Sequence, residues 1–275
     1  MHRNSEALWF DCLAVPFAVT YSVTLYRGVV LEPQRALSRV LYAFGRTVVS
    51  QLPLNLPEAC AEHAGVVYHR QYLSKDAQMA LSAQVCDIIA AAPLFQPVMP
   101  RTGKPFSVTM TNCGPLGWVS DKAGYRYQPL HPVTGEPWPP FPPALLALWR
   151  AVAGYDGMPE ACLINIYGAT ARMGSHQDRD EADFAAPVVS VSLGDAATFH
   201  VGGLKRGDAK SRFRLESGDV LVLGGASRLA FHGIDKVHVG TSPIPLGAAL
   251  ADCSRVNLTL RRVNRASTSS CGVAP

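Results

Sequence analysis

The chain has 275 residues, of which 48% are hydrophobic and 17% charged, so it can bury one large core or two smaller ones. Its formal net charge of +4 permits an anionic partner but is too small for a protein that binds nucleic acid by charge alone. The seven cysteines are odd in number and never spaced as C-x-x-C, which argues against a disulfide framework and a zinc knuckle. A reducing, cytoplasmic location is therefore expected.

The residue pattern of residues 1–57 differs from that of the rest of the chain, and this segment is interpreted as an extension of unknown role. Their apolar stretch, residues 7–26, contains Asp11 and Pro16, so neither a membrane span nor a signal peptide is predicted. No association with a membrane is expected.

Two helices are predicted before residue 160. Apolar residues recur at helical spacing from Ser74 to Ala92, with Ser74 as the N-cap. A second helix follows Pro142 and Pro143 and continues to about Gly154. The sequence between the two helices is rich in turns and aromatic residues.

After Ala161 the hydrophobic period changes to two, which indicates strands. Short alternating runs separated by Gly or Asp turns are typical of an antiparallel sandwich or barrel: CLINIYG, PVVSVSLG, ATFHVGG, SRFRLESGDVLVLGG, LAFHGI and RVNLTLRRV. Helices first and strands later indicate an α+β domain. The small, polar tail 265–275 is predicted to be disordered.

Polar residues share one face of the last predicted strand, where Arg255, Asn257, Thr259 and Arg261 alternate with apolar residues. A solvated outer face is the usual interpretation of such a pattern. The run CLINIYG repeats it with Asn165 and Tyr167, so the alternative is that both polar faces line one cavity.

A possible metal site begins at His176-x-Asp178, where a spacing of two projects both side chains to the same side of a strand end. Two imidazoles and one carboxylate leave open positions on a divalent iron, as non-haem oxygenases require. The third ligand is expected to be His232 on a later strand, with His200 and His238 as alternatives.

Eight motifs in a fixed order make the chain resemble the AlkB family of iron- and 2-oxoglutarate-dependent enzymes that repair alkylated bases. They are MTNCGPLGW, GYRY, ACLINIYG, HQDRDE, APVVSVSLG, GGLKR, SGDVLVLGGASRLAFHGI and RVNLTLRR. The resemblance implies a double-stranded β-helix, a relative of the jelly roll, in a domain covering residues 58–264. Its nucleotide-recognition lid is expected at about 110–141 and its β-helix core at about 161–263.

The resemblance also implies functional residues. His176, Asp178 and His232 would bind Fe(II), and Arg255 would bind the distal carboxylate of 2-oxoglutarate. The rest of the cosubstrate pocket, which also admits O2, would consist of Asn165, Tyr167, Asn257 and Arg261.

For the substrate, the resemblance implies that a flipped base stacks between Trp118 and His176. Asp180 would accept a hydrogen bond from the exocyclic amino group of the damaged base. Further lid contacts are expected from Met110, Tyr125 and Tyr127, and phosphate contacts from Arg172, Lys205 and Arg206. The alternative for each of these three cations is an ordinary solvated side chain. Glu181 and Asp183 have no implied role and are interpreted as part of a solvated turn.

The implied activity is oxidative demethylation of 1-methyladenine and 3-methylcytosine in single- or double-stranded DNA, or in RNA, by a monomer that needs no protein partner. One alternative is an oxygenase of the same chemistry that acts on a small metabolite or a protein. The other is a nucleic-acid-binding module without catalysis.

Overall fold

The computed structural model describes residues 65–265. The predicted extension 1–57 and residues 266–275 of the predicted tail lie outside this part of the chain, so those two predictions stay untested.

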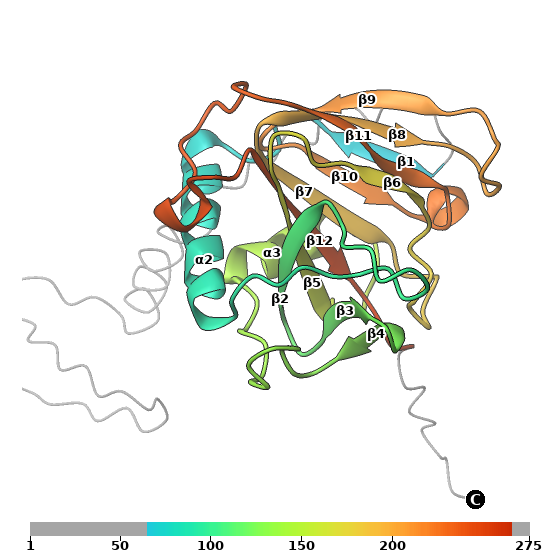
Figure 1. Ribbon diagram of the computed structural model, residues 1–275. Coiled ribbons are helices and arrows are strands. Elements are labelled where there is room, and N and C mark those ends of the chain that lie inside the picture. Colours follow the sequence, from blue (N-terminus) through green and yellow to red (C-terminus); the bar gives the residue numbers. More distant parts are fainter. Residues whose placement is uncertain (1–64, 266–275) are drawn as a thin grey trace, which may run out of the picture. The chain divides into compact units, whose positions relative to one another are not determined.

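Two antiparallel sheets form the body of the described domain (Figure 1). The larger has six strands in the order β1 (Val66–His69), β10 (Val220–Leu223), β7 (Val188–Gly194), β12 (Arg255–Arg261), β5 (Ala161–Tyr167) and β2 (Val108–Cys113). The smaller has four strands in the order β6 (Met173–His176), β11 (His232–His238), β8 (Ala196–Val201) and β9 (Ser211–Leu215). A separate hairpin consists of β3 (Gly117–Asp121) and β4 (Gly124–Gln128).

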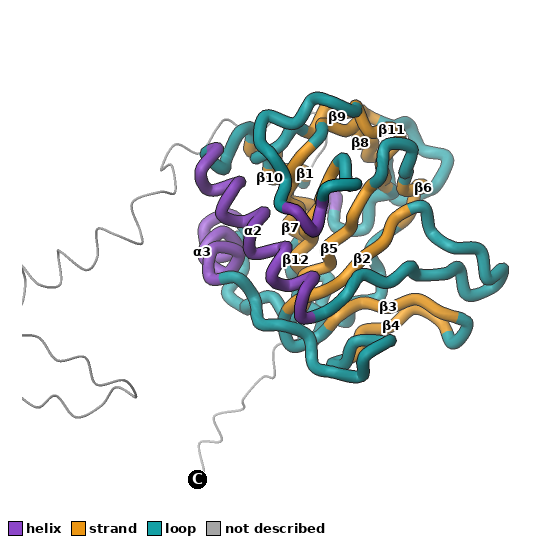
Figure 2. Tube along the Cα trace, turned by 60° about the vertical axis from the view of Figure 1, so that its left-hand side comes forward, coloured by secondary structure: helices purple, strands orange, loops and turns teal. Residues whose placement is uncertain are grey.

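Two helices lie against the larger sheet (Figure 2): α2 (Lys75–Ala91) and α3 (Pro143–Val152). The Ser74 hydroxyl accepts a hydrogen bond from the Ala77 amide at 3.2 Å, so Ser74 is the N-cap that the sequence predicts. The helix α3 begins at Pro143, where the absence of an amide hydrogen costs nothing. Two further short 3₁₀ turns occur at Gly225–Ser227 (η1) and Ala248–Leu250 (η2).

The core is divided by the larger sheet into two layers. Alternate residues of its strands, such as Val256 and Leu258, pack against α2 and α3. On the opposite face, β10 and β7 contribute Leu221 and Val188, which pack against Phe199 of the smaller sheet. This stack of helices, large sheet and small sheet confirms the predicted α+β double-stranded β-helix.

The polar face of β12 lies between the two sheets and not in solvent. Arg255 pairs in register with Tyr167, and Asn257 with Asn165, so the two polar faces are adjacent. Arg255 is fully buried and Arg261 is only 7% exposed. The interpretation of these residues as the lining of one shared cavity is thus confirmed for β12, because Arg255, Asn257, Thr259 and Arg261 all line it.

The stretch predicted as a lid, 110–141, is not structurally uniform. Its first residues, 110–113, belong to β2 at the edge of the larger sheet, whereas the β3–β4 hairpin is a separate two-stranded sheet that packs against β2 and β5. Among residues 65–265 no helix is both long and apolar enough to cross a bilayer.

Candidate metal and cosubstrate site

Three side chains from two adjacent strands of the smaller sheet converge at one point. His176 ends β6 and is paired in register with His232 at the start of β11, and the centroids of the two rings are 4.5 Å apart. Asp178 lies just beyond the end of β6, 3.6 Å from His176 Nε2 and 3.5 Å from His232 Nε2. All three possible ligand atoms lie within 4.8 Å of one another. A close approach of β11 to β6 makes this possible, since a Cβ on Gly233 would lie 2.4 Å from the Met173 carbonyl oxygen.

The backbone orients both imidazoles. Nδ1 of His176 lies 2.9 Å from the Gly174 carbonyl, and Nδ1 of His232 lies 2.9 Å from the Ala230 carbonyl. A carbonyl can only accept, so each Nδ1 carries the hydrogen and each Nε2 directs a lone pair toward Asp178. Burial, and next the neighbouring His232, lower the pKa of His176 to about 4, so its ring is neutral near pH 7.

The facing atoms of His176, Asp178 and His232 are arranged to bind a cation and do not satisfy one another by hydrogen bonds. Asp178 Oδ2 is buried and has no hydrogen-bond partner among the described residues. It faces lone pairs that cannot donate to it, which is unfavourable unless a positive charge lies between them. Although burial acts to raise the pKa of Asp178, Arg261 and His232 hold it well below the usual range, so the carboxylate is charged. This donor set fits Fe(II), with coordination positions left free.

The alternative histidines have other partners. His200 Nδ1 lies 2.8 Å from Asp235 Oδ1, and its Nε2 lies 3.1 Å from the Ser175 hydroxyl. His238 Nε2 lies 2.8 Å from the Thr198 hydroxyl. The structure therefore brings His232, and neither alternative, to the pair His176 and Asp178.

An inner cavity of about 60 Å³ adjoins the three residues between the two sheets. Arg255 borders it with one guanidinium nitrogen bonded to the Ser192 hydroxyl at 2.6 Å and another to the Asp195 carbonyl at 3.0 Å. No carboxylate within residues 65–265 contacts Arg255 as an ion-pair partner, although Asp219 and Asp195 attract it from farther away, and its Nε has no hydrogen-bond partner there. A buried cation without an anion in contact is costly, so the cavity is suited to a small carboxylate.

Other predicted cosubstrate residues lie around this cavity in different ways. Tyr167 borders it, and burial raises the pKa of its hydroxyl to about 12, so it remains a donor. Asn257 also borders it, but its amide nitrogen already donates to Ser190 and Val191. Asn165 lines the larger outer cleft instead. Arg261 borders both and bonds Asp178 Oδ1 at 2.8 Å.

The outer cleft has a volume of about 690 Å³, more than ten times that of the inner cavity, and opens next to His176. Trp118 lines it, and its indole nitrogen donates to Asp180 Oδ2 at 2.8 Å. The ring of Tyr125, which is 47% exposed, stacks on Trp118 with an interplanar angle of 16°. Met110 is buried at the base of the cleft.

Exposed arginines surround the cleft. Arg172, Arg179 and Arg206 line it, and Arg206 also donates to the Ser175 carbonyl at 2.7 Å. Lys205 is exposed but is not part of the lining. Tyr127 does not line the cleft either, and its hydroxyl donates to Glu181. Arg179 had no predicted role, although its place in the motif HQDRDE made it visible in the sequence.

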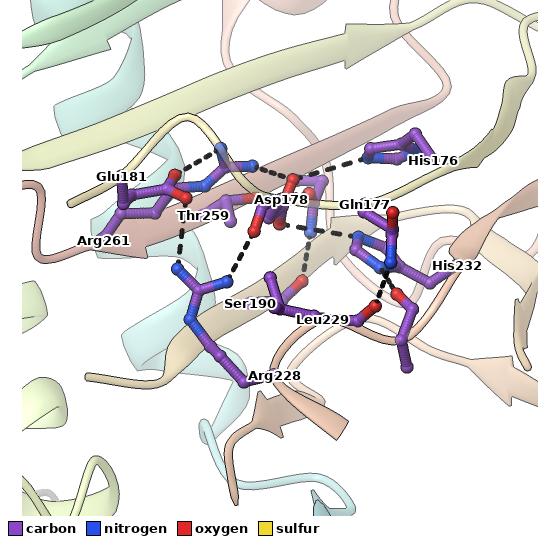
Figure 3. Close-up of polar contacts among 12 residues, drawn as sticks. His176, Gln177, Asp178, Glu181, Ser190, Arg228, Leu229, His232, Thr259 and Arg261 are labelled. Carbon is purple, nitrogen blue, oxygen red and sulfur yellow. Dashed lines mark hydrogen bonds and ion pairs between the residues drawn. The ribbon is translucent and has the colours of Figure 1, made fainter. Parts of the chain in front are cut away.

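The prediction of a solvated turn at Glu181 and Asp183 is wrong, because both side chains are buried. Glu181 accepts hydrogen bonds from Arg228 and Arg261 (Figure 3), and also from the Tyr127 hydroxyl. Asp183 accepts one from the Tyr155 hydroxyl at 2.5 Å. A run of charged residues predicts a solvent-exposed segment only when no oppositely charged residue from elsewhere in the chain pairs with it. Glu181 pairs with two arginines that lie 47 and 80 positions away in the sequence.

Comparison with known proteins identifies the family to which this chain belongs. Residues 65–261 match the model of the 2OG-Fe(II) oxygenase superfamily. An AlkB homologue from Caulobacter vibrioides, called an alpha-ketoglutarate-dependent dioxygenase, is 50% identical over 194 residues, which cover 70% of this chain and 86% of the homologue. This chain belongs to the AlkB family of the 2OG-Fe(II) oxygenase superfamily.

Other members of the AlkB family are also similar. AlkB of Escherichia coli is 44% identical over 206 residues, covering 74% of this chain and 92% of that protein. The nucleic acid dioxygenase ALKBH1 of Mus musculus is 34% identical over 163 residues, covering 58% of this chain and 40% of that protein. The solved structure of OsALKBH1 superposes with a TM-score of 0.59 and 29% identity, covering 72% of this chain and 96% of that one. The predicted family, enzyme class and cofactors, Fe(II), 2-oxoglutarate and O2, are thereby confirmed.

Proposed function

We propose that this AlkB-family enzyme removes methyl groups from N1 of adenine and N3 of cytosine in DNA or RNA by oxidation. One observation carries the proposal: an inner cavity with an unpaired buried guanidinium opens, at a three-residue metal site, onto an arginine-rimmed cleft with an aromatic wall. The names of the bacterial relatives support the oxidation, and the name of the mouse relative supports a nucleic acid substrate.

Each residue of the inner cavity has a proposed task. His176, Asp178 and His232 hold Fe(II) through the atoms that face one another, and Arg255 binds the distal carboxylate of 2-oxoglutarate with its unpaired Nε. Tyr167 donates its hydroxyl to the cosubstrate, and Asn257 and Arg261 form the wall around it. Asn165, the remaining predicted cosubstrate residue, lies on the side of the outer cleft. When bound, Fe(II) supplies the oxidising chemistry with O2.

The outer cleft holds the base. Trp118 offers a flat apolar wall opposite His176, so a flipped base can stack between them. Asp180 has one oxygen occupied by the Trp118 indole and one left to accept from an exocyclic amino group. Tyr125 stands at the mouth of the cleft, and Arg172, Arg179 and Arg206 are placed to contact phosphates.

The overall reaction follows from these positions. One atom of O2 enters the N-methyl group and the other enters 2-oxoglutarate, which becomes succinate and CO2. The hydroxymethyl product then loses formaldehyde and restores the base. Arg255 orients the cosubstrate, and Trp118 with Asp180 orients the methyl group toward the metal, which is how a protein accelerates such a step.

The test is formaldehyde release from oligonucleotides that carry 1-methyladenine or 3-methylcytosine, assayed as single and double strands of DNA and RNA. Release that requires both Fe(II) and 2-oxoglutarate is expected. Succinate formation on a metabolite or a peptide with no release from any oligonucleotide would favour the first alternative activity. Oligonucleotide binding without turnover by the wild-type protein would favour the second.

We also propose that the enzyme acts as a monomer, because the three metal-site residues, Arg255 and the cleft all belong to one chain. Sedimentation of the active full-length protein at assay concentration tests this, and an active dimer with an inactive monomer would contradict it.

A further inference from the structure

Glu181 connects the metal site to Arg261, which is predicted to line the cosubstrate pocket, and to Arg228, which has no predicted role. Its side chain is fully buried, and its Oε1 accepts from Arg261 Nη1 at 3.0 Å and from the Tyr127 hydroxyl at 2.5 Å. Its Oε2 accepts from Arg228 Nη2 at 3.1 Å. Arg261 in turn donates through Nη2 to Asp178 Oδ1. Glu181 therefore shares a guanidinium with the proposed metal ligand (Figure 3).

Arg228 holds the backbone that carries Asp178. Its Nη1 donates to the Asp178 carbonyl at 2.7 Å, and its Nε donates to the Ala186 carbonyl at 2.8 Å. It is 3% exposed and follows η1, four positions before His232. The planar guanidinium of Arg228 thus links the segment that precedes His232 to the backbone of Asp178.

The charges of this group balance without a metal. Asp178 and Glu181 contribute two negative charges, and Arg228 and Arg261 contribute two positive charges. If Glu181 were uncharged, the Asp178 carboxylate would be the one negative charge left to balance the two guanidiniums, and the group would carry one net positive charge. A divalent cation at Asp178 would then meet repulsion in a region where screening by water is weak.

We propose that Glu181 and Arg228 are positioning residues that set the metal affinity of the site, Glu181 by sharing Arg261 with Asp178 and Arg228 by holding the Asp178 backbone. The proposal rests on the proposed function in taking His176, Asp178 and His232 as the metal ligands. It concerns binding of the ion and not the substrate, so it can be tested without nucleic acid.

The experiment measures Mn²⁺ affinity of the full chain by isothermal titration calorimetry without oxygen. Glu181→Gln keeps the shape of the side chain and removes its charge, and we expect Mn²⁺ to bind about 10- to 100-fold more weakly, as when an outer partner of a ligand is lost. Arg228→Lys keeps the charge and loses the three-way fork, with an expected loss of roughly tenfold. Glu216→Gln and Arg214→Lys, an exposed ion pair on and after β9, are matched controls that should leave Mn²⁺ affinity unchanged.

Thermal unfolding of each metal-free variant separates positioning from general stability. A folded Glu181→Gln or Arg228→Lys protein that binds Mn²⁺ within about twofold of wild type, whatever its Tm, would overturn the proposal. Should Glu181→Gln not fold, Arg228→Lys decides the question. Asp178→Ala must abolish Mn²⁺ binding, and if it does not, the proposed ligand set is what fails.

Discussion

The inner cavity and the outer cleft are built from different parts of the fold. The inner cavity is bordered mainly by residues on paired strands, such as Arg255 on β12 and His232 on β11, whose positions are set by strand register. More of the outer cleft is bordered by residues of loops and of the β3–β4 hairpin, several of which are exposed, such as Tyr125 and Arg206. The comparison teaches that strand pairing fixes the part proposed for chemistry, while loops and a separate hairpin form much of the part proposed for recognition.

The largest expected effect is at the metal site. His232→Ala removes one of the three facing atoms, so decarboxylation of 2-oxoglutarate and formaldehyde release should both fall to the detection limit. Oligonucleotide binding should stay near the wild-type level, because His232 does not line the outer cleft. Both quantities can be measured on one preparation, by succinate detection and by fluorescence anisotropy. Equal loss of succinate formation and of oligonucleotide binding would show that the inner cavity and the outer cleft do not act independently.

Next in size is the loss of the buried cation of the inner cavity. Arg255→Gln should raise the KM for 2-oxoglutarate by about 100-fold, because truncating a buried charge partner costs roughly 2–5 kcal/mol. The KM for the oligonucleotide should change little. Steady-state kinetics with each reactant varied in turn checks this, with Arg214→Gln as a surface control. An unchanged KM for 2-oxoglutarate would place the carboxylate elsewhere.

A smaller effect is expected in the outer cleft. Trp118→Ala removes one stacking surface for the base, which is worth about 1–3 kcal/mol, so the KM for a methylated oligonucleotide should rise by roughly 5- to 150-fold. The KM for 2-oxoglutarate should not change, the opposite of the pattern for Arg255→Gln. Trp118→Phe keeps an aromatic face and should recover most of the loss.

A specificity change should follow from Asp180→Asn. Asparagine offers a donor as well as an acceptor, so the preference for lesions with an exocyclic amino group should fall. The expected decrease is about tenfold, because one well-placed hydrogen bond to a charged group is worth about that factor. The measurement is the ratio of kcat/KM for 3-methylcytosine, which has an exocyclic amino group, and 3-methylthymine, which has none, in the same oligonucleotide context. A ratio equal to that of wild type would show that Asp180 does not read the base.

The smallest effect should arise outside both cavities. His69 on β1 is buried with no partner for either ring nitrogen among the described residues, and burial lowers its pKa below 6.5. The unfolded chain therefore binds more protons than the folded one as pH falls below about 6.5, so the free energy of unfolding decreases from about pH 7 to about pH 5. His69→Leu should make that decrease shallower and leave both KM values unchanged, as urea unfolding at several pH values would show. An unaltered slope would contradict the assignment.

Much of the inner cavity could be predicted from the sequence, because period-two alternation in a strand fixes which residues share a face. Arg255, Asn257 and Arg261 fall on one side of β12 for that reason, and helix α2 was predicted to within one residue at each end. The boundaries of the lid were less predictable: residues 110–113 continue a strand of the main sheet, and only pairing with β5 reveals this.

What the sequence by itself determined are the strand faces, the pair His176 and Asp178, and the family. The residue pattern left His200 and His238 open beside His232, and the tertiary structure decided among them, since register places His232 opposite His176. It also decided that Glu181 is buried, because its partners Arg228 and Arg261 come from distant segments. The physical reason is that alternation is a local property of the chain, whereas the partner of a charge depends on which strands lie side by side.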